Sequence, residues 1–514
     1  MAKESRVKKT LLNVRVNLIC YMFSVIVLFF TRGILLENLG TEFIGLTGTL
    51  QSLLGFLNLA ELGVGTAIGY VLYKPIFDDD KAKINEIISV FGYLYRCIGL
   101  VILGAGIILS AFLPWIFPST SFSWGVIYFG FYAFLASSML GYFINYRQTL
   151  LSADQRNYEV TGYYQVVVNI KTIIQAFLAI YITSFLLFIA LEIVFGVIYS
   201  IILTHRINKV YPWLRSDIKL GKQLFKKYPE IGKYIKQLFV HKIGAFVQYQ
   251  ISPFLVYSYV SLPMVALYSN YTLLTQKIQN FVTGVIDSTG AGIGNLISEG
   301  NSEKIYNVYK ELFSIRLLTA SFFSICIYNF ATPFITLWLG DEYALSNTVI
   351  LLISVQCFLV LFRGIIDQFL FGYGLFYDVF APVIESLIFL AAAIILGPIW
   401  GLTGVLSAPL TSTLIIVYLW KPYFLYHKGF KKSVIHFFII FIQHLLIFFT
   451  AYYSTVYLFR LYYEEASLYN SWFHLIRGII VFSLLMLCFS IILFYIFSSG
   501  FRAFVLRFIK KKQK

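Results

Sequence analysis

The chain has 514 residues, of which 59% are hydrophobic and 12% are charged, and this balance excludes an ordinary water-soluble protein. The formal net charge is +16. It does not imply a nucleic-acid partner here, because the basic residues lie in loops between apolar stretches. The five cysteines lie inside apolar segments without metal-ligand or disulfide spacing, so we expect no disulfide, no metal site and no cofactor.

Apolar stretches long enough to cross a hydrocarbon core of about 30 Å recur along the whole chain. They predict an all-α, polytopic membrane protein with about 14 transmembrane helices. In chain order, the expected spans are residues 12–36, 43–73, 87–113, 124–151, 160–183, 185–205, 241–261, 264–295, 306–338, 346–371, 377–397, 400–421, 434–459 and 472–499.

The loops between these spans are unequal in charge. Nearly all of the Lys and Arg residues outside the spans fall on the side that carries both termini, and Arg460 is the one basic residue on the other side. The positive-inside rule therefore places both termini in the cytoplasm. Every outer loop is short, and we find no nucleotide-binding lysine motif or Ser/His/Asp arrangement in the sequence. We expect a transporter that acts within the bilayer, not an enzyme.

The domain organisation follows from a faint internal repeat. The pattern around Gly65 and Gly69 resembles that around Gly290 and Gly294, which indicates a duplicated six-helix unit. We predict an N-lobe over residues 1–205, a cytoplasmic basic linker over 206–240, a C-lobe over 241–421, and a C-terminal helix pair with a basic tail over 422–514. We expect the linker to be a solvated connection between the two lobes. The alternative is that its basic residues bind anionic lipid.

Two spans carry stripes of polar and small residues on one helical face. In the second span the stripe holds Asn58 and Glu61, and in the eighth it holds Lys277, Asn280 and Asp287. Such stripes indicate a wet cavity between the two lobes. Close helix packing through small residues is the alternative.

Further ionisable residues lie inside other spans. Arg363 and Asp367 are four residues apart and can pair on one helical face, and Lys171 and Glu192 lie at overlapping depths of one hairpin. Each pair can serve either as a structural salt bridge or in ion coupling. The embedded set is mainly basic, which suits an anionic head group such as a diphosphate. The basic residues inside spans are Arg32, Arg96, Lys171, Lys277, Arg316, Arg363 and Arg477.

Motifs along nearly the whole chain resemble those of Wzx-type polysaccharide flippases, which belong to the multidrug/oligosaccharidyl-lipid/polysaccharide exporter superfamily. The matching segments are Thr31-Arg32-Gly33-Ile34-Leu35-Leu36, Asn58-Leu59-Ala60-Glu61-Leu62-Gly63, Leu72-Tyr73-Lys74-Pro75, Tyr268-Ser269-Asn270-Tyr271, Gly294-Asn295-Leu296, and Pro333-Phe334-Ile335-Thr336-Leu337-Trp338-Leu339-Gly340.

This resemblance implies two six-helix lobes around a central cavity plus two C-terminal helices. It also implies a plasma-membrane flippase that moves a polyprenyl-diphosphate-linked oligosaccharide to the outer leaflet by alternating access. The expected substrate-binding residues are Arg32, Asn58, Lys277, Asn280, Arg316 and Arg363. Glu61, Asp287 and Asp367 are the candidates for coupling to a proton or sodium ion. A drug or cation exporter of the same fold and a membrane polysaccharide polymerase or ligase are the alternatives.

Overall fold

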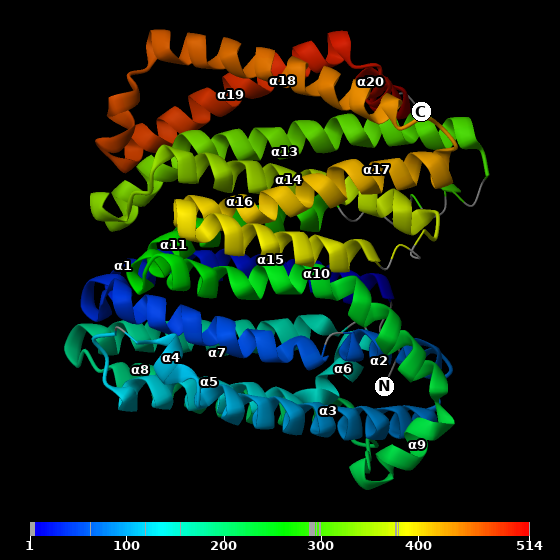
Figure 1. Ribbon diagram of the computed structural model, residues 1–514. Coiled ribbons are helices and arrows are strands. Elements are labelled where there is room, and N and C mark those ends of the chain that lie inside the picture. Colours follow the sequence, from blue (N-terminus) through cyan, green and yellow to red (C-terminus); the bar gives the residue numbers. More distant parts are fainter. Residues whose placement is uncertain are drawn as a thin grey trace. The chain divides into compact units, whose positions relative to one another are not determined.

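The computed structural model describes residues 6–61, 63–118, 120–154, 156–286, 293, 296–297, 300–375, 378 and 380–512. Every regular element within these ranges is a helix (Figure 1). Eleven helices of the described residues are long and apolar enough to span a membrane. The prediction of an all-α polytopic membrane protein is therefore confirmed.

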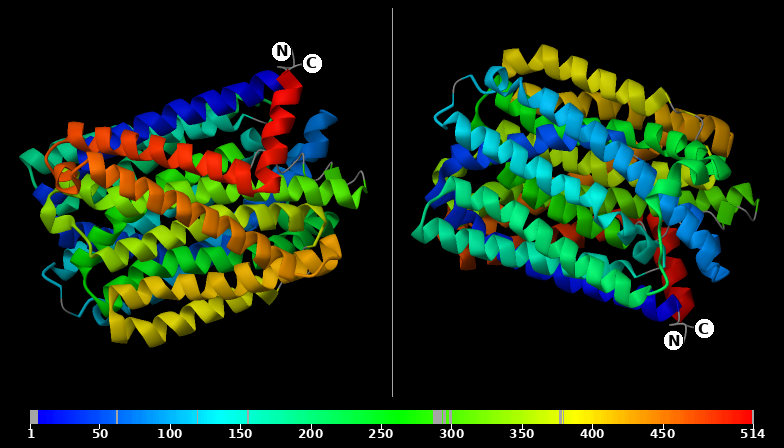
Figure 2. Two further views of the ribbon diagram at one scale, coloured as in Figure 1. Left: turned by 90° about the horizontal axis from the view of Figure 1, so that it is seen from above. Right: turned by 90° about the horizontal axis from the view of Figure 1, so that it is seen from below.

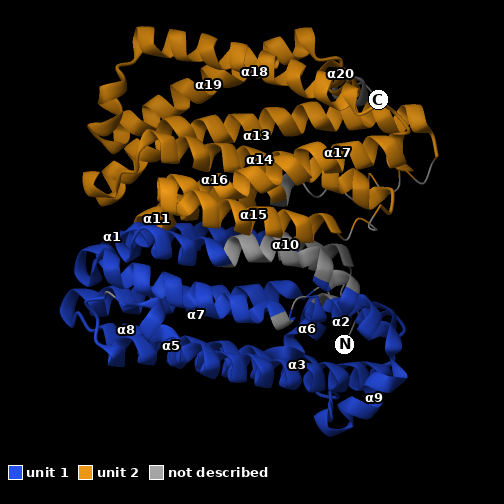
Figure 3. Ribbon diagram, viewed as in Figure 1, with its two compact units in different colours: residues 1–266 blue, residues 267–514 orange. Residues whose placement is uncertain are grey.

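The chain divides into two compact units, residues 1–266 and residues 267–514 (Figure 3). Within the first unit, α1 packs against α7 and α10, and α5 packs between α3 and α8. The helices that form this unit are α1 (Arg6–Leu57), α2 (Val64–Phe77), α3 (Lys81–Ser110), α4 (Leu113–Ile116), α5 (Trp124–Phe143), α6 (Gln148–Ala153), α7 (Asn157–Tyr181), α8 (Phe185–Val210), α9 (Gly221–Lys227) and α10 (Pro229–Tyr259).

In the second unit, α13 packs against α14, α19 and α20, and α15 forms a hairpin with α16. Helix α20 lies across the direction of α13 and α19 in both views of Figure 2. The helices are α11 (Leu262–Ile286, which begins in the first unit), α13 (Ser302–Leu339), α14 (Asn347–Gly372), α15 (Phe380–Trp400), α16 (Leu402–Thr413), the π-helix η6 (Leu414–Trp420), α17 (Lys421–Phe424), the π-helix η7 (Leu425–Phe430), α18 (Ile435–Tyr462), α19 (Trp472–Phe497) and α20 (Ser499–Lys512).

The region of the first two predicted spans is helical, with two interruptions. Gly40 has φ 81° and ψ 157°, so α1 kinks between the predicted spans. The second predicted span is itself discontinuous, because α1 ends at Leu57, a 3₁₀ turn covers Asn58–Glu61, and Gly63 precedes α2 with φ 89°. Only glycine adopts these backbone angles at little steric cost. The break places Asn58 and Glu61 on an irregular stretch of backbone.

The predicted basic linker is part of the first unit, where it packs on α3. Gly221 at the start of α9 lies so close to α3 that a Cβ would be 2.7 Å from the backbone oxygen of Ser89. Lys227 forms an ion pair with Glu86 of α3 at 2.7 Å. The segment therefore has fixed contacts with a neighbouring helix.

Candidate functional site

Glu61 lies at the break between α1 and α2, where two tyrosines from neighbouring helices meet its carboxylate. Tyr142 of α5 donates a hydrogen bond to Oε2 of Glu61 at 2.8 Å, and Tyr95 of α3 donates to Oε1. The Tyr142 hydroxyl also lies 3.0 Å from Oδ1 of Asn58. The structure thus brings together the predicted residues Asn58 and Glu61 through one shared hydroxyl.

The local sequence explains why Glu61 can face these tyrosines. In a regular helix, the helical period alone would set the direction of the side chain at position 61. The glycine at position 63 instead allows the left-handed turn that ends the 3₁₀ segment. Helix breaks at membrane depth are found where they line a cavity or bind a ligand. This break is consequently the strongest candidate site in the first unit.

Lys171 of α7 and Glu192 of α8 form the ion pair that their depths predicted. Nζ of Lys171 lies 2.7 Å from Oε1 and 2.6 Å from Oε2 of Glu192. Gln175 donates a further hydrogen bond to Oε1 at 3.0 Å. Both charged side chains are 15% exposed, so each neutralises the other where water has little access.

Asp367 of α14 is held by two cations in the second unit. Its Oδ2 lies 3.3 Å from Nε of Arg363, as the spacing predicted, and its Oδ1 lies 2.6 Å from Nζ of Lys421. Arg363 also approaches Glu385 of α15 at 3.9 Å. This cluster joins three helices, and its two cations compensate the charge of the Asp367 carboxylate.

Arg316 of α13 is 2% exposed and packs against α14 beside this cluster. Its Nε donates a hydrogen bond to the backbone oxygen of Leu361 at 2.6 Å. Gly364 provides the space, because a Cβ there would lie 1.9 Å from Nη2 of Arg316. The guanidinium is therefore fixed in the interface between α13 and α14.

The remaining predicted site residues lie on α1 and α11. Arg32 is half-buried on α1, whereas Lys277 is half-buried and Asn280 is exposed on α11. These residues belong to different units, so their predicted joint action on one substrate stays a prediction. Asp287 lies outside the described residues.

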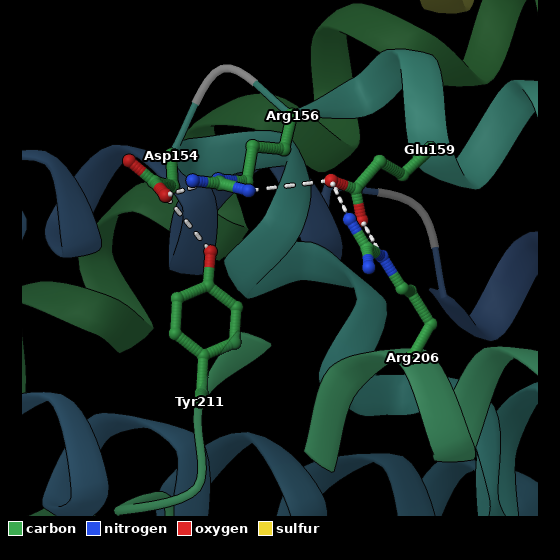
Figure 4. A network of polar contacts seen from close by, with 5 residues as sticks. All are labelled: Asp154, Arg156, Glu159, Arg206 and Tyr211. Atoms are coloured by element: carbon green, nitrogen blue, oxygen red, sulfur yellow. Dashed lines mark hydrogen bonds and ion pairs between the residues drawn. The ribbon is translucent and has the colours of Figure 1, made fainter. Parts of the chain in front are cut away.

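A charged network that the sequence did not indicate lies near the start of α7 and the end of α8 (Figure 4). Glu159 accepts hydrogen bonds from Arg206 at 2.7 and 2.9 Å, and Arg156 lies between Glu159 and Asp154. Tyr211 donates to Asp154 at 2.9 Å. Burial and the neighbouring Asp154 carboxylate raise the pKa of Tyr211, so its hydroxyl stays a neutral donor. The network ties the start of α7 to the end of α8.

Sequence reasoning also missed Tyr95, Tyr142 and Lys421 as partners of the candidate carboxylates. The chain contains 38 tyrosines and 40 Lys and Arg residues, and no local pattern distinguishes these three. Lys421 lies 54 positions beyond Asp367, and Tyr142 lies 81 positions beyond Glu61. Such distant partners become neighbours only through helix packing.

No family model and no curated protein matches this sequence. Solved structures do match its fold. The lipid II flippase MurJ in an inward closed conformation aligns with a TM-score of 0.61 and 15% identity over 94% of this chain and 99% of that chain. A multidrug resistance MATE family transporter of the MOP superfamily, in an inward-facing conformation, aligns with a TM-score of 0.57 and 16% identity over 78% and 93%. A MOP superfamily transporter from Pyrococcus furiosus aligns with a TM-score of 0.52 and 17% identity over 82% and 96%.

These alignments cover most of the chain and nearly all of each solved structure. At such low identity they show the fold and nothing finer. The chain shares its fold with the lipid II flippase MurJ and with a MATE family transporter, which confirms the fold that the motif resemblance predicted.

Proposed function

We propose that this protein is a flippase that moves a polyprenyl-diphosphate-linked oligosaccharide from the cytoplasmic to the outer leaflet of the plasma membrane. The observation that carries the proposal is its fold, which it shares with a lipid II flippase over 94% of its length. The motifs of polysaccharide flippases along the sequence support the same substrate class. Both termini lie in the cytoplasm in this proposal, as the distribution of basic residues predicts.

The transport cycle needs no covalent chemistry. In the proposed mechanism the two lobes alternate between inward-facing and outward-facing states, while the prenyl tail stays in the lipid. Positive side chains neutralise the diphosphate, because a phosphate that leaves water requires charge-assisted hydrogen bonds. We assign this role to Lys277 and Arg32 first. The other proposed substrate contacts are Asn58, Asn280, Arg363 and Arg316, the last of which must leave its buried place between α13 and α14 to meet substrate.

Glu61 is the proposed carrier of a coupling proton or sodium ion. Among the described residues, the side chains that hydrogen-bond its carboxylate are the neutral tyrosines Tyr95 and Tyr142. Asp367, by contrast, contacts both Arg363 and Lys421. A carboxyl held by neutral donors gains or loses a proton with less rearrangement than one held between two cations. Asp367 therefore ranks below Glu61, and Asp287 remains a reserve candidate.

The experiment that tests the function is depletion of the protein in cells that make the surface polysaccharide. We expect lipid-linked repeat units to accumulate on the cytoplasmic leaflet while surface polysaccharide falls. A clean deletion that leaves normal surface polysaccharide, in a cell with no second copy of such a transporter, would contradict the proposal.

A drug exporter is the second candidate, because a multidrug resistance transporter aligns with a TM-score of 0.57. The two candidates predict different cargo. Drug efflux by the purified protein in proteoliposomes, without movement of lipid-linked sugar, would favour the exporter. The mainly basic residues in the spans favour an anionic lipid over a cationic drug.

A further inference from the structure

The first unit contains a cavity of about 720 Å³ within its own helices. Residues of α1, α5, α7 and α8 line it, together with Asn145 and Gln148 from the segment after α5. Its volume lies in the range of about 300–1,000 Å³ that is typical of small-molecule sites. The cavity therefore has the size of a binding site.

The polar groups in the lining of this cavity carry no net charge. Lys171 and Glu192 are its charged lining residues, and they pair with each other at 2.6 Å. The other polar groups are amides and hydroxyls, including Gln148 and Tyr199, which are joined by a hydrogen bond of 3.2 Å. Such a surface offers donors and acceptors to a neutral molecule and offers no cation for a diphosphate.

One buried acceptor in this lining has no hydrogen-bond partner within the described chain. Asn145 is 6% exposed, and its amide nitrogen donates to Ser200 at 3.0 Å. Its Oδ1 atom is buried and accepts no hydrogen bond from any described residue. A buried carbonyl oxygen without a hydrogen-bond donor is unfavourable.

Aromatic rings complete the wall. Tyr164 and Tyr199 lie in edge-to-face contact with ring centroids 5.4 Å apart, and Phe134 and Phe195 also line the cavity. Aromatic and apolar surface combined with a few convergent amides and hydroxyls suits a ligand that has both C–H faces and hydroxyl groups. Sugars combine these features.

From these observations we infer that the cavity of the first unit is a sugar-recognition site, which binds part of the oligosaccharide through neutral hydrogen bonds. This inference rests on the proposed function and adds to it a place where sugar is recognised separately from diphosphate. Asn58 links the two roles, because it lines the cavity and shares the Tyr142 hydroxyl with Glu61. A sugar bound at Asn58 is therefore linked to the proposed coupling carboxylate of Glu61 through the Tyr142 hydroxyl.

Gly141 allows the cavity to be filled without disturbing its neighbours. It lines the cavity, and a Cβ at this position meets no heavy atom within 4 Å. Gly104 on α3 has the same open surroundings but does not line the cavity, so it provides a matched control. Both residues lie inside long helices, where replacement of glycine is favourable for helix formation.

The test compares wild type, Gly141→Leu and Gly104→Leu in nanodiscs with two probes. One probe is undecaprenyl diphosphate without sugar, and the other is the lipid-linked oligosaccharide fraction extracted from the cells that make the protein. We expect Gly141→Leu to weaken binding of the sugar-bearing lipid by on the order of tenfold while binding of the sugar-free lipid stays within about twofold. Gly104→Leu should bind both probes like wild type. Gln148→Ala, which removes an amide without filling the space, should repeat the selective loss.

The outcomes separate the inference from the function. If Gly141→Leu and Gln148→Ala bind both probes as tightly as wild type, the sugar site is contradicted while the flippase proposal stands. Equal weakening of both probes by these two variants would also contradict a separate sugar site. If the wild-type protein binds neither probe, the proposed function and the inference fall together.

Discussion

Gly364 and Arg316 fit each other across the interface of α13 and α14, because the guanidinium occupies the space that a side chain at position 364 would need. A Cβ on Gly364 would lie 1.9 Å from Nη2 and 2.8 Å from Cζ of Arg316. The side chain of Arg316 cannot withdraw easily, since it is 2% exposed and bonded to the backbone of Leu361. This fit joins Arg316, a residue that the sequence indicated, to Gly364, which the sequence did not indicate.

The first prediction follows from this contact. Gly364→Ala should lower the stability of the folded protein by roughly 1–3 kcal/mol, because the new methyl group displaces a buried, hydrogen-bonded guanidinium. Thermal unfolding of the purified protein in one detergent measures the effect. Gly104→Ala is the control, because a methyl group there meets no neighbouring atom. Equal melting temperatures for Gly364→Ala and wild type would show that Arg316 moves aside freely.

The second prediction concerns Lys277 and the charge of the diphosphate. Lys277→Arg should keep most transport of lipid-linked oligosaccharide, whereas Lys277→Ala should abolish it at an unchanged protein level, because an anionic group needs a cation in a site with little water. Transport by reconstituted variants measures this difference. Full activity of Lys277→Ala would assign the residue to the scaffold of α11.

The third prediction concerns energy coupling at Glu61. An imposed pH or sodium gradient should accelerate transport by the wild-type protein in proteoliposomes, and Glu61→Gln should remove that acceleration, since glutamine carries no ionisable proton. Transport without a gradient provides the baseline for each variant. An equal response of both proteins would exclude Glu61 from coupling, and no response in the wild type would exclude coupling altogether.

The fourth prediction concerns the ion pair of Lys171 and Glu192. Glu192→Gln or Lys171→Met alone should destabilise the protein by roughly 3 kcal/mol, because each change leaves one charge without its partner where only 15% of the side chain is exposed. The double variant should recover most of this loss. A double-mutant cycle on unfolding free energies measures the interaction directly. Additive losses in the double variant would show that the two charges do not stabilise each other.

The sequence by itself determined the fold class and the position of most helices. Hydrocarbon thickness sets a minimum length for an apolar helix, so a local count of apolar residues is enough to find a span. It also indicated the ionisable residues that the bilayer disfavours, and two of its pairings, Lys171 with Glu192 and Arg363 with Asp367, are confirmed. These pairings could be predicted from the sequence because the two partners lie on one helix or on one hairpin.

Only the tertiary structure decided which distant side chains meet these residues. Tyr95 and Tyr142 reach Glu61 from α3 and α5, and Lys421 reaches Asp367 from α17. The discontinuity of the second span at Gly63 likewise depends on a positive φ that an apolar pattern does not reveal. An apolar stretch predicts that a helix lies in the membrane. Because every membrane-embedded helix has such a stretch, it does not predict which helices contact each other. The choice of neighbours depends on the shape of small and large side chains across each interface, as Gly364 and Arg316 show.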